Sequence, residues 1–163
     1  MTTMAPTLDA RAFRNACGGF STGVTIISTR SGENDHAMTA NAFMSVSLDP
    51  PLIAISLANT ARMLPRLRAA GGFAVSVLRA GMEDIAWHFA GRTRAGGPPP
   101  FTELAGLPTI RDAASTFVAD VHSEVTAGDH VIVIGHVHTM HCDPQARPLL
   151  FHSGRFANLP ETA

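Results

Sequence analysis

Small polar and apolar residues alternate along residues 38–48, MTANAFMSVSL, and this is the clearest pattern in the chain. Successive side chains of a strand point to opposite faces, so the pattern predicts one strand with two different faces. One face carries small polar side chains, namely Thr39, Asn41, Ser45 and Ser47. Phe43 interrupts this polar face, and the opposite face is apolar. The polar face has no long charged side chain, so a flat polar ligand could approach its backbone closely. A strand that faces water or a partner protomer is the alternative.

Runs of β-branched and apolar residues predict further strands at 23–29, 52–57, 72–78, 116–125, 130–140, 149–152 and 155–157. Apolar residues at helical spacing predict helices at 8–20 and 82–90, and a short helix with Pro65 in its first turn. Residues 30–35 and 49–51 read as turns, and residues 91–100, GRTRAGGPPP, as a loop that serves as a lid or a partner contact. Many strands with few short helices predict a closed or partly closed antiparallel barrel.

The length of 163 residues suits a single domain, 1–163, with a real core. Charged residues make up only 15% of the chain, against about 25% in typical soluble domains, which predicts that an oligomer hides part of the surface. The net charge of −1 argues against nucleic acid or an anionic membrane as a partner. All basic residues are arginines, so a phosphate site would use arginine, hydroxyl groups or backbone N–H groups.

The two cysteines, Cys17 and Cys142, form no CxxC pair and no disulfide framework, so we expect a reduced, cytoplasmic protein. The first residues show no signal peptide, and no apolar run reaches the roughly 18 residues of a membrane span. The chain has no GxGxxG motif and no P-loop. A nicotinamide cofactor would therefore bind without a Rossmann domain.

Histidines are frequent in the last third of the chain, and His136 and His138 share one face of a predicted strand. Such a pair can bind zinc, but the remaining ligands would come from irregularly spaced residues, so we expect no metal site. Gly135 lies inside an apolar run and predicts a bend or bulge of the barrel. Trp87 and Phe89 are expected to pack in the core or against a partner protomer.

Five segments together resemble the flavin reductase-like family, the short reductase partners of two-component flavin-dependent monooxygenases. They are MTANAFMSVSLDPPLIAIS, Arg62 with Leu64-Pro65, GFAVSVL, AGDHVIVIGHV and PLLFHSGRF, and the resemblance runs from about Phe13 to Phe156. It implies a mainly β, FMN-binding split barrel of six antiparallel strands in a Greek key, with a few short helices, working as a homodimer. It also implies reduction of FMN or FAD by NADH or NADPH, after which the reduced flavin leaves for a separate monooxygenase.

The resemblance further implies which residues bind the flavin. The isoalloxazine ring is expected against Thr39, Ala40 and Asn41, and the ribityl chain or phosphate at Ser45 and Ser47. The end of the next strand and the following loop complete the site, with the phosphate at its far end: Ser56, Leu57, Ala58, Asn59, Thr60 and Arg62. Met63 stands where many relatives carry a hydroxyl group, which puts one phosphate contact in doubt.

His130, in the GDH segment, is expected near the flavin where nicotinamide stacks, with a role in positioning and charge balance. The alternative is a turn histidine bonded to Asp129. His152 and Gly154 are expected on the nicotinamide side, with a hairpin histidine as the alternative for His152. Gly154 would permit close approach of the cofactor.

Two rival functions stay open at this point. One is another enzyme on the same barrel, such as a pyridoxamine-phosphate-oxidase-like protein, although the absence of lysine argues against its basic phosphate site. The other is a non-catalytic protein, either a flavin- or haem-binding split barrel or a dimeric interaction module. The choices between FMN and FAD, and between NADH and NADPH, also stay open.

Overall fold

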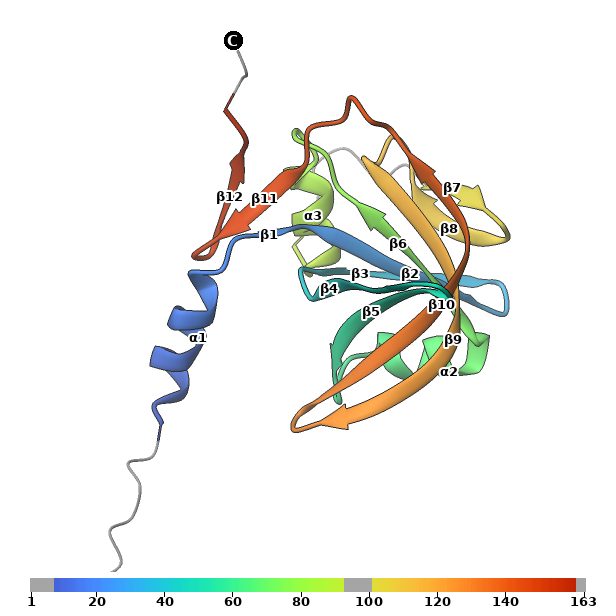
Figure 1. Cartoon of the computed structure of the whole chain (residues 1–163), viewed down its shortest axis with the longest axis horizontal. Coiled ribbons are helices and arrows are strands. Elements are labelled where there is room, and N and C mark those ends of the chain that lie inside the picture. Colours follow the sequence, from blue (N-terminus) through green and yellow to red (C-terminus); the bar gives the residue numbers. More distant parts are fainter. Residues whose placement is uncertain (1–7, 93–100, 161–163) are drawn as a thin grey trace, which may run out of the picture.

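The computed structural model describes residues 8–92 and 101–160, and strands dominate it (Figure 1). Its helices are α1 (Ala10–Gly18), α2 (Met63–Ala70) and α3 (Glu83–Phe89). The strands of the first half are β1 (Thr22–Gly23), β2 (Thr25–Ser31), β3 (Asn34–Ala40), β4 (Phe43–Leu48), β5 (Pro51–Ala58) and β6 (Gly72–Val77). Those of the second half are β7 (Phe101–Leu104), β8 (Leu107–Ile110), β9 (Ser115–Ala127), β10 (His130–Cys142), β11 (Leu149–His152) and β12 (Arg155–Asn158). The mainly β architecture with few short helices is confirmed.

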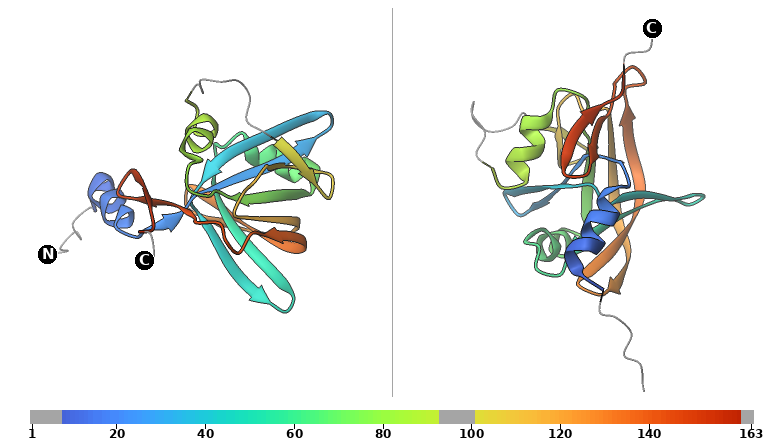
Figure 2. Two further views of the ribbon diagram at one scale, coloured as in Figure 1. Left: turned by 90° about the horizontal axis from the view of Figure 1, so that it is seen from above. Right: turned by 90° about the vertical axis from the view of Figure 1, so that its left-hand side faces the viewer.

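The main sheet has the strand order β3-β2-β6-β9-β10-β5-β4, and every neighbouring pair is antiparallel. It has seven strands in the described part of the chain, one more than the expected six. Its two edge strands, β3 and β4, follow each other in sequence but do not pair with each other. The hairpins β2–β3 and β4–β5 diverge from their common corner, so the sheet curls without closing, as in a split barrel (Figure 2, left).

The prediction of one continuous strand over 38–48 is wrong. The chain leaves the first strand after Ala40 and enters the next at Phe43, where it pairs with β5 instead of β2. The register slips again between Ser45 and Ser47. The expected apolar back is not core either, because Met44, Val46 and Leu48 are 57%, 44% and 96% exposed. Phe43, the interruption of the pattern, stacks on Phe117 with a centroid distance of 5.7 Å and packs against the core.

The core has two parts because the sheet is covered on both faces around β2. Ile27 of β2 belongs to a cluster with Leu67 of α2 and Phe73 of β6. Ile26, on the opposite face, belongs to a second cluster with Ile85 of α3. Residues 24–29 are all buried, and the β-branched residues that are frequent in this segment suit a strand packed on both faces.

Gly135 marks an irregularity in the β9–β10 ladder, as predicted from its place in an apolar run. The residue has no room for a side chain. A Cβ atom there would lie 2.6 Å from Cζ of Phe73 and 2.9 Å from Cβ of Ala119, and both neighbours are fully buried. The glycine therefore lets β10 bend over the central aromatic ring of the core.

The first helix and the last strands form an arm beside the barrel, made of α1, β1, β11 and β12 (Figures 1 and 2). Asp9 caps α1 as predicted, since its Oδ1 accepts a hydrogen bond of 2.6 Å from the amide of Ala12. The three strands pair in the order β1-β11-β12, and the amide of Ser153 donates to the carbonyl of Gly18 at 2.9 Å. No residue of α1 is buried.

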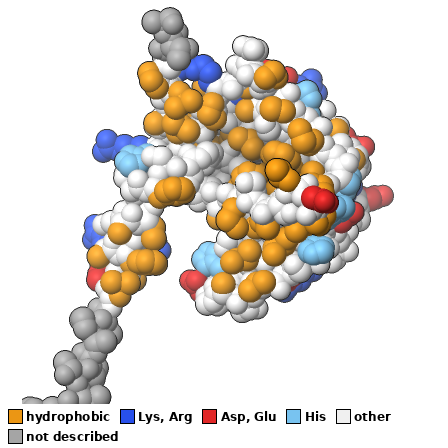
Figure 3. Space-filling model, viewed as in Figure 1, with side chains coloured by type: hydrophobic (Ala, Val, Ile, Leu, Met, Phe, Trp, Pro, Cys, Tyr) orange, Lys and Arg blue, Asp and Glu red, His pale blue; other side chains and the backbone are white. Residues whose placement is uncertain are grey.

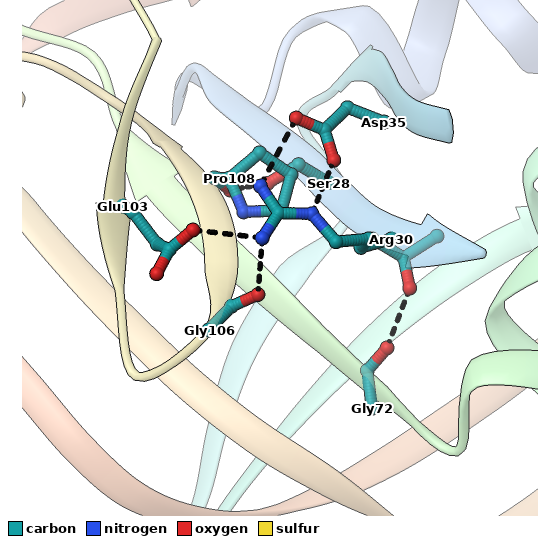
Figure 4. A network of polar contacts seen from close by, with 8 residues as sticks. Ser28, Arg30, Asp35, Gly72, Glu103, Gly106 and Pro108 are labelled. Atoms are coloured by element: carbon teal, nitrogen blue, oxygen red, sulfur yellow. Dashed lines mark hydrogen bonds and ion pairs between the residues drawn. The ribbon is translucent and has the colours of Figure 1, made fainter. Parts of the chain in front are cut away.

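The hairpin β7–β8 was not predicted from the sequence, and polar contacts hold it on the barrel (Figure 4). Arg30 of β2 donates to Asp35 at 2.7 Å and to Glu103 of β7 at 2.7 Å. These two carboxylates raise the pKa of the Arg30 guanidinium above its ordinary value. Ser28 donates its hydroxyl hydrogen to the carbonyl of Pro108 in β8. The predicted loop 30–35 is therefore largely strand, with its turn at Gly32.

The remaining helix ends follow the predicted signals. Gly71 ends α2 in the left-handed conformation, with a φ of 72°. The predicted lid or contact loop at 91–100 lies, from residue 93 on, outside the described residues. None of the three described helices has the length and the hydropathy that a bilayer crossing requires.

Candidate functional site

A cavity of about 770 Å³ lies between the arm and the barrel. Three phenylalanines contribute apolar walls, namely Phe20, Phe43 and Phe151. Polar groups come from Asn41 at the corner between β3 and β4, and from Arg14, Asn15 and Thr22 of the arm. Apolar walls with a few polar groups are the usual lining of a site for a flat heterocyclic ligand. Of the predicted site residues, Asn41 and Gly154 line this cavity.

Gly154 has a second role, which is to shape the tip of the arm. Ser153 and Gly154 form the two-residue turn of the β11–β12 hairpin, with φ angles of 47° and 81°. Two positive φ angles are typical of the tight hairpin turn that matches the strand twist. Glycine adopts this backbone conformation without strain.

Thr39 and Ala40 lie next to a smaller hollow of about 180 Å³, beside Trp87 of α3. The hydroxyl of Thr39 donates to the carbonyl of Ala86 in α3 at 2.6 Å. The hydroxyl expected to donate to the flavin ring thus holds α3 on β3, which leaves only its lone pairs for a ligand. Trp87 packs against Phe156 at a centroid distance of 4.9 Å, in line with its predicted packing role.

Ser45 and Ser47 lie on the part of β4 that pairs with Ile53 and Leu52. The loop with Asn59 and Arg62 follows the opposite end of β5. Ala58 follows Leu52 by six positions, which is about 20 Å along a strand at roughly 3.3 Å per residue. These serines and the Arg62 group are therefore too far apart to bind the same phosphate. Of the two roles expected for Ser45 and Ser47, this geometry disfavours the phosphate and leaves the ribityl chain.

The end of β5 brings the next group of predicted residues beside the β3–β4 corner. The amide of Ser56 donates to the carbonyl of Ala42 at 3.2 Å. Asn59 binds the β9–β10 turn, with its amide donating to Asp129 O at 2.9 Å and its Nδ2 to Gly128 O at 3.3 Å. The side chain of Leu57 is 1% exposed and packs in the core, so only its backbone is left to contact a ligand. The structure does place Ala58 and Thr60 at the surface of this segment.

Arg62 is exposed at the N-cap position just before α2, where no side chain caps the helix and no acidic residue lies in the first turn. Arg66 lies one turn further and donates to the carbonyl of Arg62 at 2.9 Å. Burial lowers the pKa of His36 on β3, and the charges of Arg66 and Arg62 lower it further. These shifts favour the neutral form of His36, so the positive charge here comes from the two guanidinium groups. Guanidinium groups beside an uncapped helix N-terminus suit an anionic ligand.

His130 begins β10, pairs with Ala58 of β5, and is half-exposed. Its Nδ1 lies 2.7 Å from Oδ1 of Asp129, and this hydrogen bond lowers the pKa of the Asp129 carboxyl. The contact is the one expected for a turn histidine, yet it leaves Nε2 of the ring available to a ligand.

His152 is placed differently from the prediction. Its Nδ1 lies 2.9 Å from the hydroxyl of Ser21, and its Nε2 lies 3.2 Å from the hydroxyl of Ser153. Both ring nitrogens thus bind groups of the arm, and His152 is not among the residues that line the large cavity. This supports the hairpin-histidine alternative.

Most residues of the large cavity were not identified from the sequence, among them Phe20 and Thr22. These two lie between α1 and β2, in a stretch with neither strand alternation nor a motif that we could interpret. No group of three or more histidine, cysteine, aspartate or glutamate side chains within residues 8–92 and 101–160 could hold a metal ion. The pair His136 and His138 stays without further ligands there.

Comparisons with known proteins agree on one family. The family model described as "Flavin reductase like domain" matches residues 17–160. The reductase component of 4-hydroxyphenylacetate 3-monooxygenase from Thermus thermophilus is 37% identical over 91% of this chain and 95% of its own length. A flavin reductase solved in its native state is 42% identical, with a TM-score of 0.91, over 94% of this chain and 100% of that chain.

A further solved relative carries its cofactors. The NADH:FAD oxidoreductase SgcE6 of Streptomyces globisporus, in complex with NAD and FAD fragments, is 37% identical with a TM-score of 0.88. The match covers 98% of this chain and 99% of that chain. The segments that resembled the family in sequence thus come together in one matching fold, and the chain belongs to the flavin reductase-like family.

Proposed function

We propose that this protein is an NAD(P)H:flavin oxidoreductase that transfers hydride from NAD(P)H to FMN or FAD and supplies the reduced flavin to a separate monooxygenase. The observation that carries the proposal is the 770 Å³ cavity between three phenylalanines and Asn41, at the corner of the MTANAF segment. Relatives of the same length are reductase components and NADH-dependent flavin reductases. We also propose that residues 1–163 form one domain, active in the cytoplasm, where its two exposed, unpaired cysteines stay reduced.

The residues present fit a flavin. Its flat ring needs apolar walls and a polar edge, and the cavity supplies both. At the corner, the carbonyl of Ala42 accepts a hydrogen bond from the amide of Ser56. Asn59 and Arg62 follow Ser56 in the chain, so they extend the site away from the corner. We place the ring at Ala40 and Asn41 and the phosphate at Asn59, Thr60 and Arg62. Ser45 and Ser47 lie too far along β4 to share that phosphate.

The bound flavin supplies the hydride acceptor, and the protein supplies position and electrostatics. Asn41 orients the polar edge of the ring, and the phenylalanine walls exclude water from it. Arg62 neutralises the phosphate with a guanidinium that stays charged at all physiological pH values. We assign His130 to the nicotinamide side, where Nε2 positions the cofactor while Asp129 holds the ring through Nδ1.

The first test is oxidation of NADH and NADPH by the purified protein with FMN, with FAD and with neither, followed by the loss of nicotinamide absorbance. We expect oxidation only when a flavin is added, because the chain itself provides no redox group. The combination of nicotinamide cofactor and flavin with the largest kcat/KM shows whether the protein prefers NADH or NADPH, and FMN or FAD. Absence of oxidation under every combination, in protein that remains folded, would contradict the proposal and favour the non-catalytic binding protein.

We also propose that the protein is a homodimer. Large apolar side chains are exposed on two elements, α1 and β4, and include Phe13, Met44 and Leu48. Those of α1 form part of an apolar surface that is visible on the arm in Figure 3. A helix without a buried residue gains little stability from its own chain, since helices in proteins are stabilised mainly by packing. A second copy that covers the arm and β4 would bury these side chains.

Glutamate in place of Leu48, which is 96% exposed, is expected to weaken the dimer at least about 10-fold. The change removes an apolar contact and places a charge in the interface. Analytical ultracentrifugation over a range of concentrations measures the effect. The matched control is Asn34→Glu, which adds the same charge at an exposed position of the β2–β3 hairpin and should leave the dimer unchanged. If both variants dimerise with the same affinity, β4 is not part of the dimer interface.

A further inference from the structure

Thr22 lies in β1, where the arm joins the barrel. Its Oγ1 atom is buried, and no hydrogen-bond partner for it exists among residues 8–92 and 101–160. Leaving a buried hydroxyl unpaired costs free energy, and native structures keep few such groups. The unpaired hydroxyl therefore requires an explanation.

The neighbouring hydroxyl groups all have partners within the protein. Ser21 binds Nδ1 of His152 at 2.9 Å, and Thr25 donates to the carbonyl of Ala40 at 2.7 Å. Thr39, which the sequence placed at the flavin ring, donates to Ala86 at 2.6 Å. Of these four hydroxyl groups, that of Thr22 is the one without a partner in the described structure.

Thr22 also lines the 770 Å³ cavity, together with Asn41, Phe43 and Phe151. The residue as a whole is only partly buried, so part of its side chain faces the cavity. Rotation about χ1 exchanges the positions of Oγ1 and Cγ2 of a threonine between staggered wells. The hydroxyl can thus turn toward a ligand without any movement of the backbone, which the pairing of Thr22 with Phe151 holds in place.

We infer that Thr22 is a flavin-binding residue whose hydroxyl forms a hydrogen bond with the polar edge of the isoalloxazine ring. The inference rests on the proposed function. A hydroxyl both donates and accepts, so it suits a ring edge that presents carbonyl oxygens and an N–H group. Together with Asn41, it is one of the neutral polar groups that line the cavity between its aromatic walls. Thr22 takes the place that the sequence assigned to the hydroxyl of Thr39.

The test compares Thr22→Val, which keeps the shape but removes the hydroxyl, with Thr22→Ser, which keeps the hydroxyl. Binding is measured by quenching of flavin fluorescence, with lumiflavin, which lacks the ribityl phosphate, and with FMN. We expect Thr22→Val to raise the Kd of both by the same factor, about 5- to 30-fold, and Thr22→Ser to restore most of the affinity. The ligand-free valine variant should melt no lower than the wild type, because it loses an unpaired hydroxyl.

Three results would overturn the inference. The first is wild-type affinity of the valine variant for lumiflavin. The second is a loss of FMN affinity with no loss for lumiflavin, which would assign the hydroxyl to a phosphate beside Arg14 of the same cavity. The third is a lower melting temperature with unchanged binding, which would reveal a structural partner. Binding is read without NADH, so wild-type protein that binds flavin but oxidises no NADH refutes the proposed function while leaving the role of Thr22 measurable.

Discussion

Asparagine in place of His130 is expected to lower kcat/KM for NADH, at saturating flavin, by roughly 10- to 100-fold. The Nδ1 atom of His130 lies 2.7 Å from Asp129, and the side-chain amide of asparagine can keep a similar hydrogen bond. What the asparagine lacks is a second polar atom where Nε2 lies. Loss of a hydrogen bond that involves a charged partner costs about 1.5–3 kcal/mol, and each 1.4 kcal/mol is a factor of ten. Steady-state NADH oxidation measures the effect.

Two controls show whether His130 acts on NADH. His136→Asn changes another exposed histidine of β10 and should leave kcat/KM as in the wild type. Flavin Kd should be unchanged in His130→Asn, because the change lies on the nicotinamide side of the proposed site. Asp129→Asn should lower kcat/KM for NADH by a smaller factor, because Asp129 only holds the imidazole ring of His130 in place. An unaltered kcat/KM in His130→Asn would contradict a role in binding NADH and would support the alternative of a turn histidine bonded to Asp129.

Alanine in place of Gly135 is expected to destabilise the protein by about 1–3 kcal/mol, the usual cost of overpacking a core. Its Cβ atom would lie 2.6 Å from the ring of Phe73 and 2.9 Å from Cβ of Ala119, and neither neighbour can move into solvent. For a chain of this size, such a loss lowers Tm by roughly 2–12 °C. Thermal unfolding followed by circular dichroism, together with urea unfolding, measures it.

Gly23→Ala is the matched control, because the same substitution in β1 meets no atom within 4 Å and its φ is not positive. It should melt close to the wild type. A second comparison uses Phe73→Leu, which shortens the side chain that the new methyl group would strike. Gly135→Ala should cost less in that background than in the wild type, as expected for residues in contact. Equal costs in both backgrounds would show that Phe73 is not the cause.

Local signals in the sequence predicted the local structure well. Asp9 caps α1, glycines end α1 and α2, and the Ser153-Gly154 pair forms the tight turn between β11 and β12. These features depend on neighbours within a few residues, so the sequence contains the information needed to predict them. The hairpin β7–β8 was missed because its short strands have no clear alternation, and a distant arginine, Arg30, holds it on the barrel.

The family, the β architecture and the positions of most strands could be predicted from the sequence alone, and so could the β3–β4 corner that we propose for the ligand. Which side chains line the proposed cavity depended on the tertiary structure. Thr39 is turned to Ala86, Leu57 is buried, and His152 is held by Ser21, whereas Thr22 lines the cavity. Periodicity in the sequence assigns a residue to one face of a strand, but it does not show which other segment packs on that face. The packing depends on contacts between segments that are distant in sequence, such as the contact between Ser21 and His152.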